Sequence, residues 1–195
     1  MKPYDKYAAQ SEMFMVSIIP MMLSYLPKDG THYEVLDIGS RSGHGAALLQ
    51  RVLSKNAGAR ISMNVIASNL NEQETLWLKD CFGEELPCVT FDVNNDEQRE
   101  LVGTYDIVIA SHMIEHTKDT KQTFRNIASM AKKMFIIACP YMEEKLHHGT
   151  WWHDSSVGKE TLIDIIPPNQ CIVIDDVGYP YCKCFYGIYL KGERK

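Results

Sequence analysis

The stretch from Tyr33 to Leu49, YEVLDIGSRSGHGAALL, constrains the fold of this chain more than any other. Its apolar run predicts a buried strand over 34–38, and the spacing of its later apolar residues predicts a helix over 43–54. Gly39 and Gly43 allow a tight turn between the two, because glycine adopts positive φ without strain. The first N–H groups of a helix have no partner within it and can bind a ligand. The sequence therefore predicts a strand, a turn and a helix with a polar ligand at the turn.

The spacing of the turn residues decides which class of ligand fits. A dinucleotide-binding turn needs G-x-G-x-x-G, but counting from Gly39 this chain has Arg41 and His44 at the second and third glycine positions. The acid Asp37 followed by Gly39 and Gly43 instead resembles the first motif of the class I S-adenosylmethionine-dependent methyltransferases, an acid followed by G-x-G-x-G. Arg41 departs from that motif at its middle glycine. An ordinary strand, turn and helix of an α/β protein is the alternative interpretation.

A second segment, TYDIVIASHMIEHTKD from Thr104 to Asp119, supports the same resemblance. An aromatic residue and an aspartate open an apolar strand, which an I-E-H turn follows. This pattern is similar to the F-D-x-V…L-E-H-V segment of many small-molecule methyltransferases. Two matches in the right order are much harder to obtain by chance than one. The chain is therefore identified as a member of the small, single-domain class I methyltransferases, similar to methyltransferase types 11 and 23.

Alternating strand and helix patterns fill the chain and predict a doubly wound α/β fold. The family resemblance implies a Rossmann-like, seven-stranded sheet, mostly parallel with an antiparallel C-terminal strand. We expect one methyltransferase domain over 1–195, with a helical cap over 1–28 and a substrate loop over 141–158. The expected strands after the first lie at 61–67, 88–92, 104–111, 134–139, 171–177 and 184–190, and the expected helices at 4–26, 43–54, 71–81, from 95 or 96, 120–132 and 159–166.

Composition limits the partners of the chain. Its 195 residues are 45% hydrophobic and 23% charged with a formal net charge of −5, so we do not expect a nucleic-acid partner. The apolar run Met13 to Leu26 is too short to span a bilayer and contains Pro20, so we expect an amphipathic helix and no membrane association. The six cysteines include no C-x-x-C pair, which favours reduced thiols in a cytoplasmic protein.

The resemblance also assigns residues to S-adenosylmethionine. It implies that Asp37 binds the amino end of the cofactor and that Asp92 accepts from the adenine amino group. Asn69 stands where the family has an acid for the ribose hydroxyls, so we expect weaker ribose binding unless Glu72 or Glu74 compensates. The alternatives are a helix cap for Asp92 and a solvent-facing loop position for Asn69. The cofactor-binding residues that we expect are Asp37, Gly39, Ser40, Arg41, Gly43, Asn69, Asp92, Val93 and Ser111.

Three residues after the fourth strand, His112, Glu115 and His116, are the candidate catalytic residues. Their spacing of i, i+3 and i+4 places them on one face if the segment is a helical turn. They could support the fold through hydrogen bonds, or one histidine could act as a general base. A metal site is a third interpretation, with His147, His148 or His153 as a later ligand. We do not expect a divalent metal; the candidates for one are His112, Glu115, His116 and His148.

The expected function is S-adenosylmethionine-dependent methylation of a small molecule. We expect transfer to oxygen, because no Asn/Asp-Pro-Pro-aromatic motif follows the fourth strand. The first alternative is a metal-dependent enzyme similar to the RNA 2′-O-methyltransferases. The second is a catalytically inactive, methyltransferase-like binding module, which the departures at Arg41 and Asn69 would favour.

Overall fold

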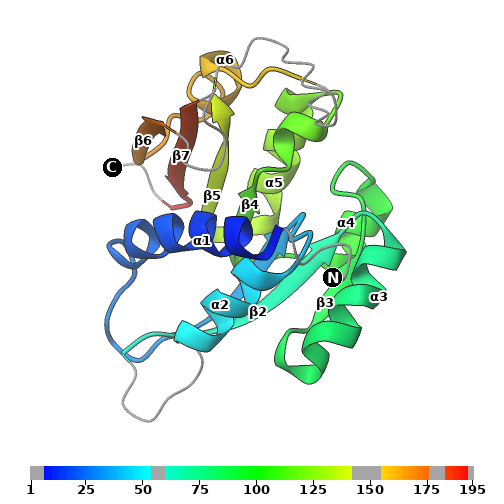
Figure 1. The fold of residues 1–195 in the computed structure, drawn as a ribbon. Coiled ribbons are helices and arrows are strands. Elements are labelled where there is room, and N and C mark those ends of the chain that lie inside the picture. The colour runs from blue at the N-terminus through cyan, green and yellow to red at the C-terminus, as the bar shows by residue number, and fades with distance from the viewer. Residues whose placement is uncertain (1–6, 54–59, 142–154, 176–182, 193–195) are drawn as a thin grey trace.

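A seven-stranded sheet forms the centre of the molecule (Figure 1). The structure, a computed structural model, describes residues 7–53, 60–141, 155–175 and 183–192. The strands follow the order β3-β2-β1-β4-β5-β7-β6, and only β7 runs antiparallel to its neighbours. This confirms the predicted fold class. The strands are β1 (His32–Ile38), β2 (Ser62–Asn69), β3 (Cys88–Thr90), β4 (Tyr105–Ser111), β5 (Ala131–Tyr141), β6 (Gln170–Asp175) and β7 (Lys183–Leu190).

Helices cover both faces of the sheet (Figure 1). Apolar side chains of the first three helices pack in one core, and those of the later helices pack in the other. The helices are α1 (Ala8–Leu23), α2 (His44–Leu53), α3 (Glu72–Phe82), α4 (Asp96–Val102), α5 (Thr120–Met130) and α6 (Lys159–Leu162). Two short 3₁₀ turns, η2 (Gly83–Glu85) and η3 (Ile114–His116), complete the described elements.

The central strand β1 explains why the apolar run is nearly continuous. Tyr33 and Val35 point into the core beneath α1 and α2, whereas Leu36 and Ile38 point into the core beneath α5. A parallel strand buried on both faces needs apolar residues in both directions. β1 pairs with β2 on one side and β4 on the other, so the chain order reverses here and the carboxyl ends of β1 and β4 border a crevice.

Most predicted elements are present with shifted ends. α1 begins at Ala8 and continues through Pro20 to Leu23, and residues 1–6 lie outside the described ranges. β3 ends at Thr90 rather than at 92. The last helix, α6, has four residues instead of the predicted eight, because its segment leaves the helical path after Leu162. Most of the predicted substrate loop, 142–154, lies outside the described ranges, so the predicted division of the domain stays a prediction.

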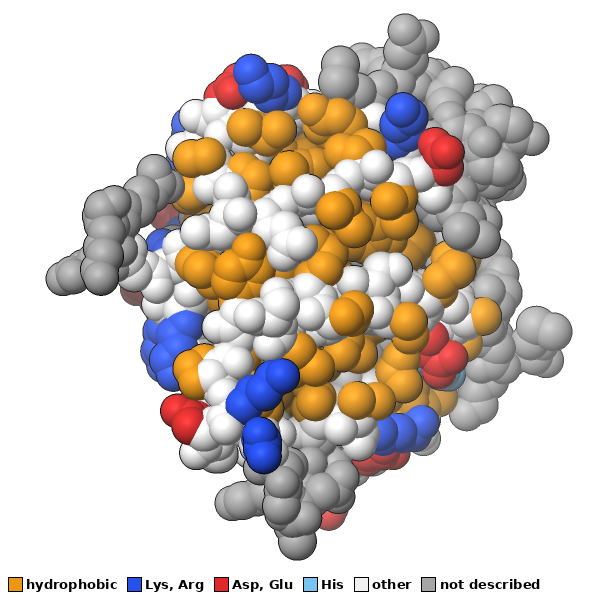
Figure 2. Space-filling model, turned by 90° about the vertical axis from the view of Figure 1, so that its left-hand side faces the viewer, with side chains coloured by type: hydrophobic (Ala, Val, Ile, Leu, Met, Phe, Trp, Pro, Cys, Tyr) orange, Lys and Arg blue, Asp and Glu red, His pale blue; other side chains and the backbone are white. Residues whose placement is uncertain are grey.

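The side of the molecule formed by β6 and β7 carries many hydrophobic side chains (Figure 2). β6 is the last described strand of the sheet, and Ile172, Val173 and Ile174 on it are 38–42% exposed. Within the described ranges, no helix combines the length and the hydropathy that crossing a membrane requires.

Candidate active site

The turn after β1 shows why two glycines are needed. Gly39 has a φ of 72°, and a Cβ there would lie 2.8 Å from the Cβ of Met113. Gly43 has a φ of 73°, and a Cβ there would lie 2.5 Å from the Cδ2 of Leu78 on α3. Gly39 lines the crevice at the carboxyl ends of β1 and β4, whereas Gly43 does not. Gly43 therefore lets the turn before α2 pack closely against Leu78 of α3, and its place in the cofactor site stays a prediction.

Arg41 and Asn69, the two departures from the family motifs, contact each other. Arg41 adopts a φ of 47°, in the left-handed region that glycine usually occupies. Its N–H donates to the Oδ1 of Asn69 at 2.7 Å, and the Nδ2 of Asn69 donates to its carbonyl at 3.2 Å. Asn69 is 3% exposed, so its amide is not a solvent-facing loop group. These two bonds hold the backbone of the turn.

A cavity of about 710 Å³ opens beside this turn, which is within the size range of cofactor sites. Its wall combines the apolar groups Ile38, Phe91 and Val93 with several polar ones. Three of the polar residues carry carboxylates: Glu74 on α3, Asp92 in the loop after β3 and Asp119 at the N-cap of α5. This cavity can accommodate a planar, partly polar ring together with a hydroxyl-bearing group.

Asp92 does not cap α4, so that alternative is wrong. The cap is Asn95, whose side chain accepts from the N–H of Gln98 at 3.1 Å. The carboxylate of Asp92 accepts instead from the N–H of Asn94 at 2.8 Å, while its own N–H donates to Gln98 Oε1. These bonds fix Asp92 in the wall of the larger cavity next to Val93, which is buried.

A narrower cavity of about 60 Å³ lies between the turn and α1. Asp37 lines it and is only 5% exposed; this burial raises the pKa of its carboxyl from 3.8 to about 7, and Ser40 partly offsets the effect. The hydroxyls of Ser42 and Ser111 also line this cavity, and both are buried without a hydrogen-bond partner among the described residues. Such groups are costly to leave unpaired, so the narrow cavity suits a polar, cationic ligand group.

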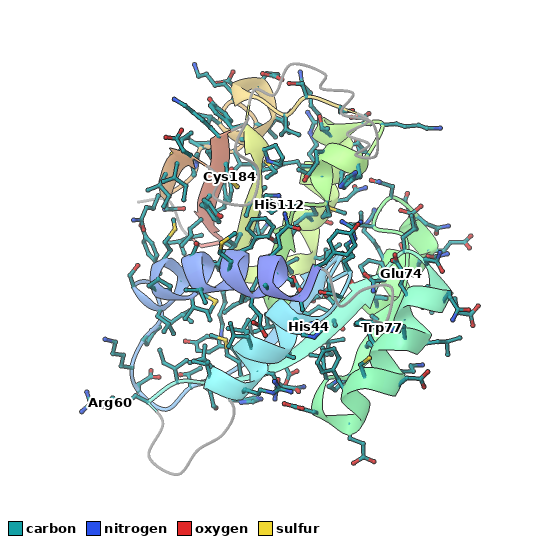
Figure 3. The ribbon with its side chains drawn as sticks, in the orientation of Figure 1. His44, Arg60, Glu74, Trp77, His112 and Cys184 are labelled. Carbon is teal, nitrogen blue, oxygen red and sulfur yellow. The ribbon has the colours of Figure 1, made fainter. Side chains whose placement is uncertain are left out.

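Gly39, Arg41, His112 and His116 line both cavities, so the two meet at these residues. His112 has a φ of 52° and stacks on Phe14 of α1, with 3.6 Å between ring centroids. Its Nε2 lies 3.5 Å from the Sγ of Cys184, and its Nδ1 lies 3.6 Å from Oε1 of Glu115. In Figure 3, His112 and Cys184 lie above α1, and Glu74 lies to their right on α3.

Glu115 is 1% exposed and sits in η3 behind His112. Burial alone would raise the pKa of Glu115, but the nearby imidazoles of His112 and His116 hold the pKa below its ordinary value. His112 precedes η3 instead of belonging to a helical turn, so the condition for a common helical face of the three residues is not met. His112 nevertheless contacts Glu115 from its left-handed backbone, with 3.6 Å between Nδ1 and Oε1.

The predicted site residues fall into four groups. The narrow cavity is lined by Asp37, Ser40 and Ser111, and the larger one by Asn69, Asp92 and Val93. Both cavities are lined by Gly39, Arg41, His112 and His116. Glu115 and Gly43 line neither. His147, His148 and His153 lie outside the described ranges, and within those ranges no three histidine, cysteine, aspartate or glutamate side chains are grouped to hold a metal ion.

Among the residues that sequence reasoning missed are Phe14 and Ser42 in the wall of the narrow cavity and Cys184 beside His112. Phe14 and Cys184 come from α1 and β7, which are far from His112 in sequence, so no local spacing could reveal their contacts with it. Ser42 lies inside the recognised turn, and its position next to Gly43 was the only available signal.

The two joined cavities fit an S-adenosyl ligand. The larger one offers carboxylates and an apolar wall to an adenosine, and the narrow one offers Asp37 and two unpartnered hydroxyls to an amino-acid end. Asp37, Arg41, Asp92 and Glu74 are the residues that would hold its charged and hydrogen-bonding groups.

Comparisons with known proteins agree with this geometry. The family model for a methyltransferase domain matches residues 7–169. No protein with a curated description matches the chain by sequence. Similar solved structures include the CurJ carbon methyltransferase, with a TM-score of 0.70, 16% identity and coverage of 97% of this chain and 56% of that one. The chain thus spans little more than half of that relative's length.

Two further solved structures match most of both chains. The magnesium protoporphyrin IX methyltransferase of Synechocystis, solved with bound S-adenosylhomocysteine, has a TM-score of 0.67 and 14% identity, over 97% of this chain and 88% of that one. A putative sarcosine dimethylglycine methyltransferase of Galdieria sulphuraria has a TM-score of 0.65 and 10% identity, over 98% and 91%. Since the family model covers most of the chain, the protein belongs to the methyltransferase-domain family, with the fold of the class I S-adenosylmethionine-dependent methyltransferases.

Proposed function

We propose that this protein transfers a methyl group from S-adenosylmethionine to an oxygen atom of a small molecule. The observation that carries the proposal is the junction of the two cavities, where His112 and His116 form part of the wall. When bound, S-adenosylmethionine supplies an electrophilic methyl carbon. A hydroxyl acceptor at the junction would need to lose a proton, and an imidazole is suited to accept it near neutral pH.

We assign the general base to His112 and the orientation of its ring to Glu115. The buried carboxylate lies 3.6 Å from Nδ1, where it favours a proton on that nitrogen. Nε2 then carries the lone pair that can accept a proton. It lies 3.5 Å from the Sγ of Cys184, so a bound acceptor would have to replace that thiol contact. Phe14 stacks on the imidazole ring and so restricts its movement, which would keep the base aligned with a bound acceptor.

The cysteines support the proposed cytoplasmic location. The five described cysteines, Cys81, Cys88, Cys139, Cys171 and Cys184, form no disulfide. Reduced cysteines are typical of that compartment.

The test measures the release of S-adenosylhomocysteine with panels of small phenols, alcohols, carboxylic acids and amines. We expect turnover with oxygen acceptors. His112→Asn should lower kcat about a hundredfold or more, because asparagine tolerates the left-handed backbone but is not a base. His44→Asn is the matched control, since His44 lines neither cavity, and it should keep its activity. Transfer to amines alone, or an unchanged kcat for His112→Asn, would contradict the proposal.

A further inference from the structure

The two motif departures of this chain are joined to each other. Arg41 replaces the usual middle glycine of the first motif, and Asn69 replaces the usual acid after the second strand. The residues are 28 positions apart, yet the side-chain amide of Asn69 binds both the N–H and the carbonyl of Arg41. A pair of unrelated losses would not be expected to form two matching hydrogen bonds.

The chemistry of these bonds explains why Asn69 is an amide. Left-handed backbone is energetically unfavourable for a residue with a Cβ, and Arg41 has a φ of 47°. The amide of Asn69 offers one acceptor to the Arg41 N–H and one donor to its carbonyl. An ionised aspartate would supply the acceptor but no donor. Asn69 therefore holds an arginine where the family has glycine.

The side chain of Arg41 extends to the narrow cavity. Its guanidinium lies 3.8 Å above the ring of Tyr7, just before α1, and both residues line that cavity. Among the described residues of its wall, Arg41 is the only lysine or arginine and Asp37 the only carboxylate. A guanidinium and a carboxylate in the wall of one cavity are suited to a ligand with an ammonium and a carboxylate on neighbouring atoms. The amino-acid end of an S-adenosyl ligand has that arrangement.

We propose that Asn69 and Arg41 form a coupled carboxylate subsite: Asn69 fixes the backbone of Arg41, and the guanidinium binds the carboxylate of the methionine portion of the ligand. The inference rests on the proposed function, because it assumes that the site takes an S-adenosyl ligand. Arg41 is then a ligand-binding residue, and Asn69 is a positioning residue that acts through it. The ribose hydroxyls are left to Glu74, which lines the larger cavity.

The first test is calorimetric and needs no methyl acceptor. S-adenosylhomocysteine and its decarboxylated analogue, in which hydrogen replaces the carboxylate, are titrated into wild-type protein and into Arg41→Gln. We expect Arg41→Gln to weaken S-adenosylhomocysteine binding about tenfold or more and to change the analogue less than twofold. Lys118→Gln is the control, because Lys118 lines only the larger cavity and should not distinguish the two ligands.

Equal effects of Arg41→Gln on the two ligands, or no effect on either, would overturn the subsite. Wild-type protein that binds neither ligand would contradict the proposed function, and the subsite with it. Binding of both ligands to the wild type, without discrimination by Arg41, would contradict the subsite alone.

The second test compares the effect of Asn69→Asp on S-adenosylhomocysteine affinity in two backgrounds, where we expect effects of opposite sign. Asn69→Asp restores the family's acid but removes the donor to the Arg41 carbonyl, so we expect it to weaken S-adenosylhomocysteine binding several-fold. In the Arg41→Gly background, where no such clamp is needed, the same Asn69→Asp change should strengthen binding. If Asn69 were a ribose ligand independent of Arg41, Asn69→Asp would act in the same direction in both backgrounds, and that result would overturn the coupling.

Discussion

Replacing Asp37 by asparagine should stabilise the protein at neutral and alkaline pH. Burial raises the pKa of Asp37 from 3.8 to about 7, a difference of about three pKa units, which corresponds to at most ~4 kcal/mol of unfolding free energy. Between these two pKa values the native protein holds a proton that the unfolded chain has lost. Wild-type stability therefore falls as the pH rises from about 4 to about 7, and it levels off above that range.

Asp37→Asn removes this ionisation. The difference in unfolding free energy between the variant and the wild type should be close to zero near pH 4 and grow to a few kcal/mol at pH 8. Urea denaturation at pH 4, 5, 6, 7 and 8, followed by tryptophan fluorescence, measures it. The same variant should lose affinity for S-adenosylhomocysteine, because a neutral amide attracts the ligand's ammonium less strongly than a carboxylate does.

Asp106→Asn provides a control of opposite sign. Burial would raise the pKa of Asp106, but the N–H of Glu34 and the ammonium of Lys133, 3.1 Å away, hold it below its ordinary value. Its stabilising contribution is present above the unfolded pKa and is lost as the pH falls through the folded one. Asp106→Asn should thus destabilise the protein at neutral pH only. A pH-independent effect of Asp37→Asn would refute the reasoning about its burial.

Three further predictions concern single contacts. Gly43→Ala should cost roughly 1–3 kcal/mol of stability in thermal unfolding, from a clash with Leu78 and a positive φ, while the affinity of the folded protein for S-adenosylhomocysteine stays within about threefold. Glu74→Gln should weaken S-adenosylhomocysteine and 5′-methylthioadenosine equally, by roughly tenfold, because both carry the ribose; calorimetry that shows loss for only one would exclude the ribose role. His112→Ala should lower the free energy of unfolding by about 3 kcal/mol, because it leaves the buried carboxylate of Glu115 without the imidazole of His112. Urea denaturation should show that adding Glu115→Gln restores part of that loss; additive effects of the two changes would show that the pair is uncoupled.

The sequence predicted the fold well because the strands and glycine turns carry local signals. β1 and β4 are buried on both faces, so their apolar runs were unambiguous, and the turn at Gly39 needed a residue that adopts positive φ. The end of β3 and the length of α6 were predicted less well, since pairing and packing with distant segments decide them.

The candidate site was only partly predictable. Asp37 and Asp92 follow strands whose ends meet at the crevice, so their positions could be inferred from topology. The role of Asn69 could not be inferred from the sequence, because it depends on two hydrogen bonds to the backbone of Arg41. The surroundings of His112 are also non-local: its ring lies between Phe14 of α1 and Cys184 of β7.

Calorimetric titration of wild-type protein with S-adenosylhomocysteine at pH 8, where Asp37 is ionised, tests the central claim most directly, with NAD as the control ligand. The cavities beside Gly39 predict micromolar binding of S-adenosylhomocysteine at one site and no binding of NAD. Absence of S-adenosylhomocysteine binding at millimolar concentration, or equal binding of NAD, would contradict the assignment of this site.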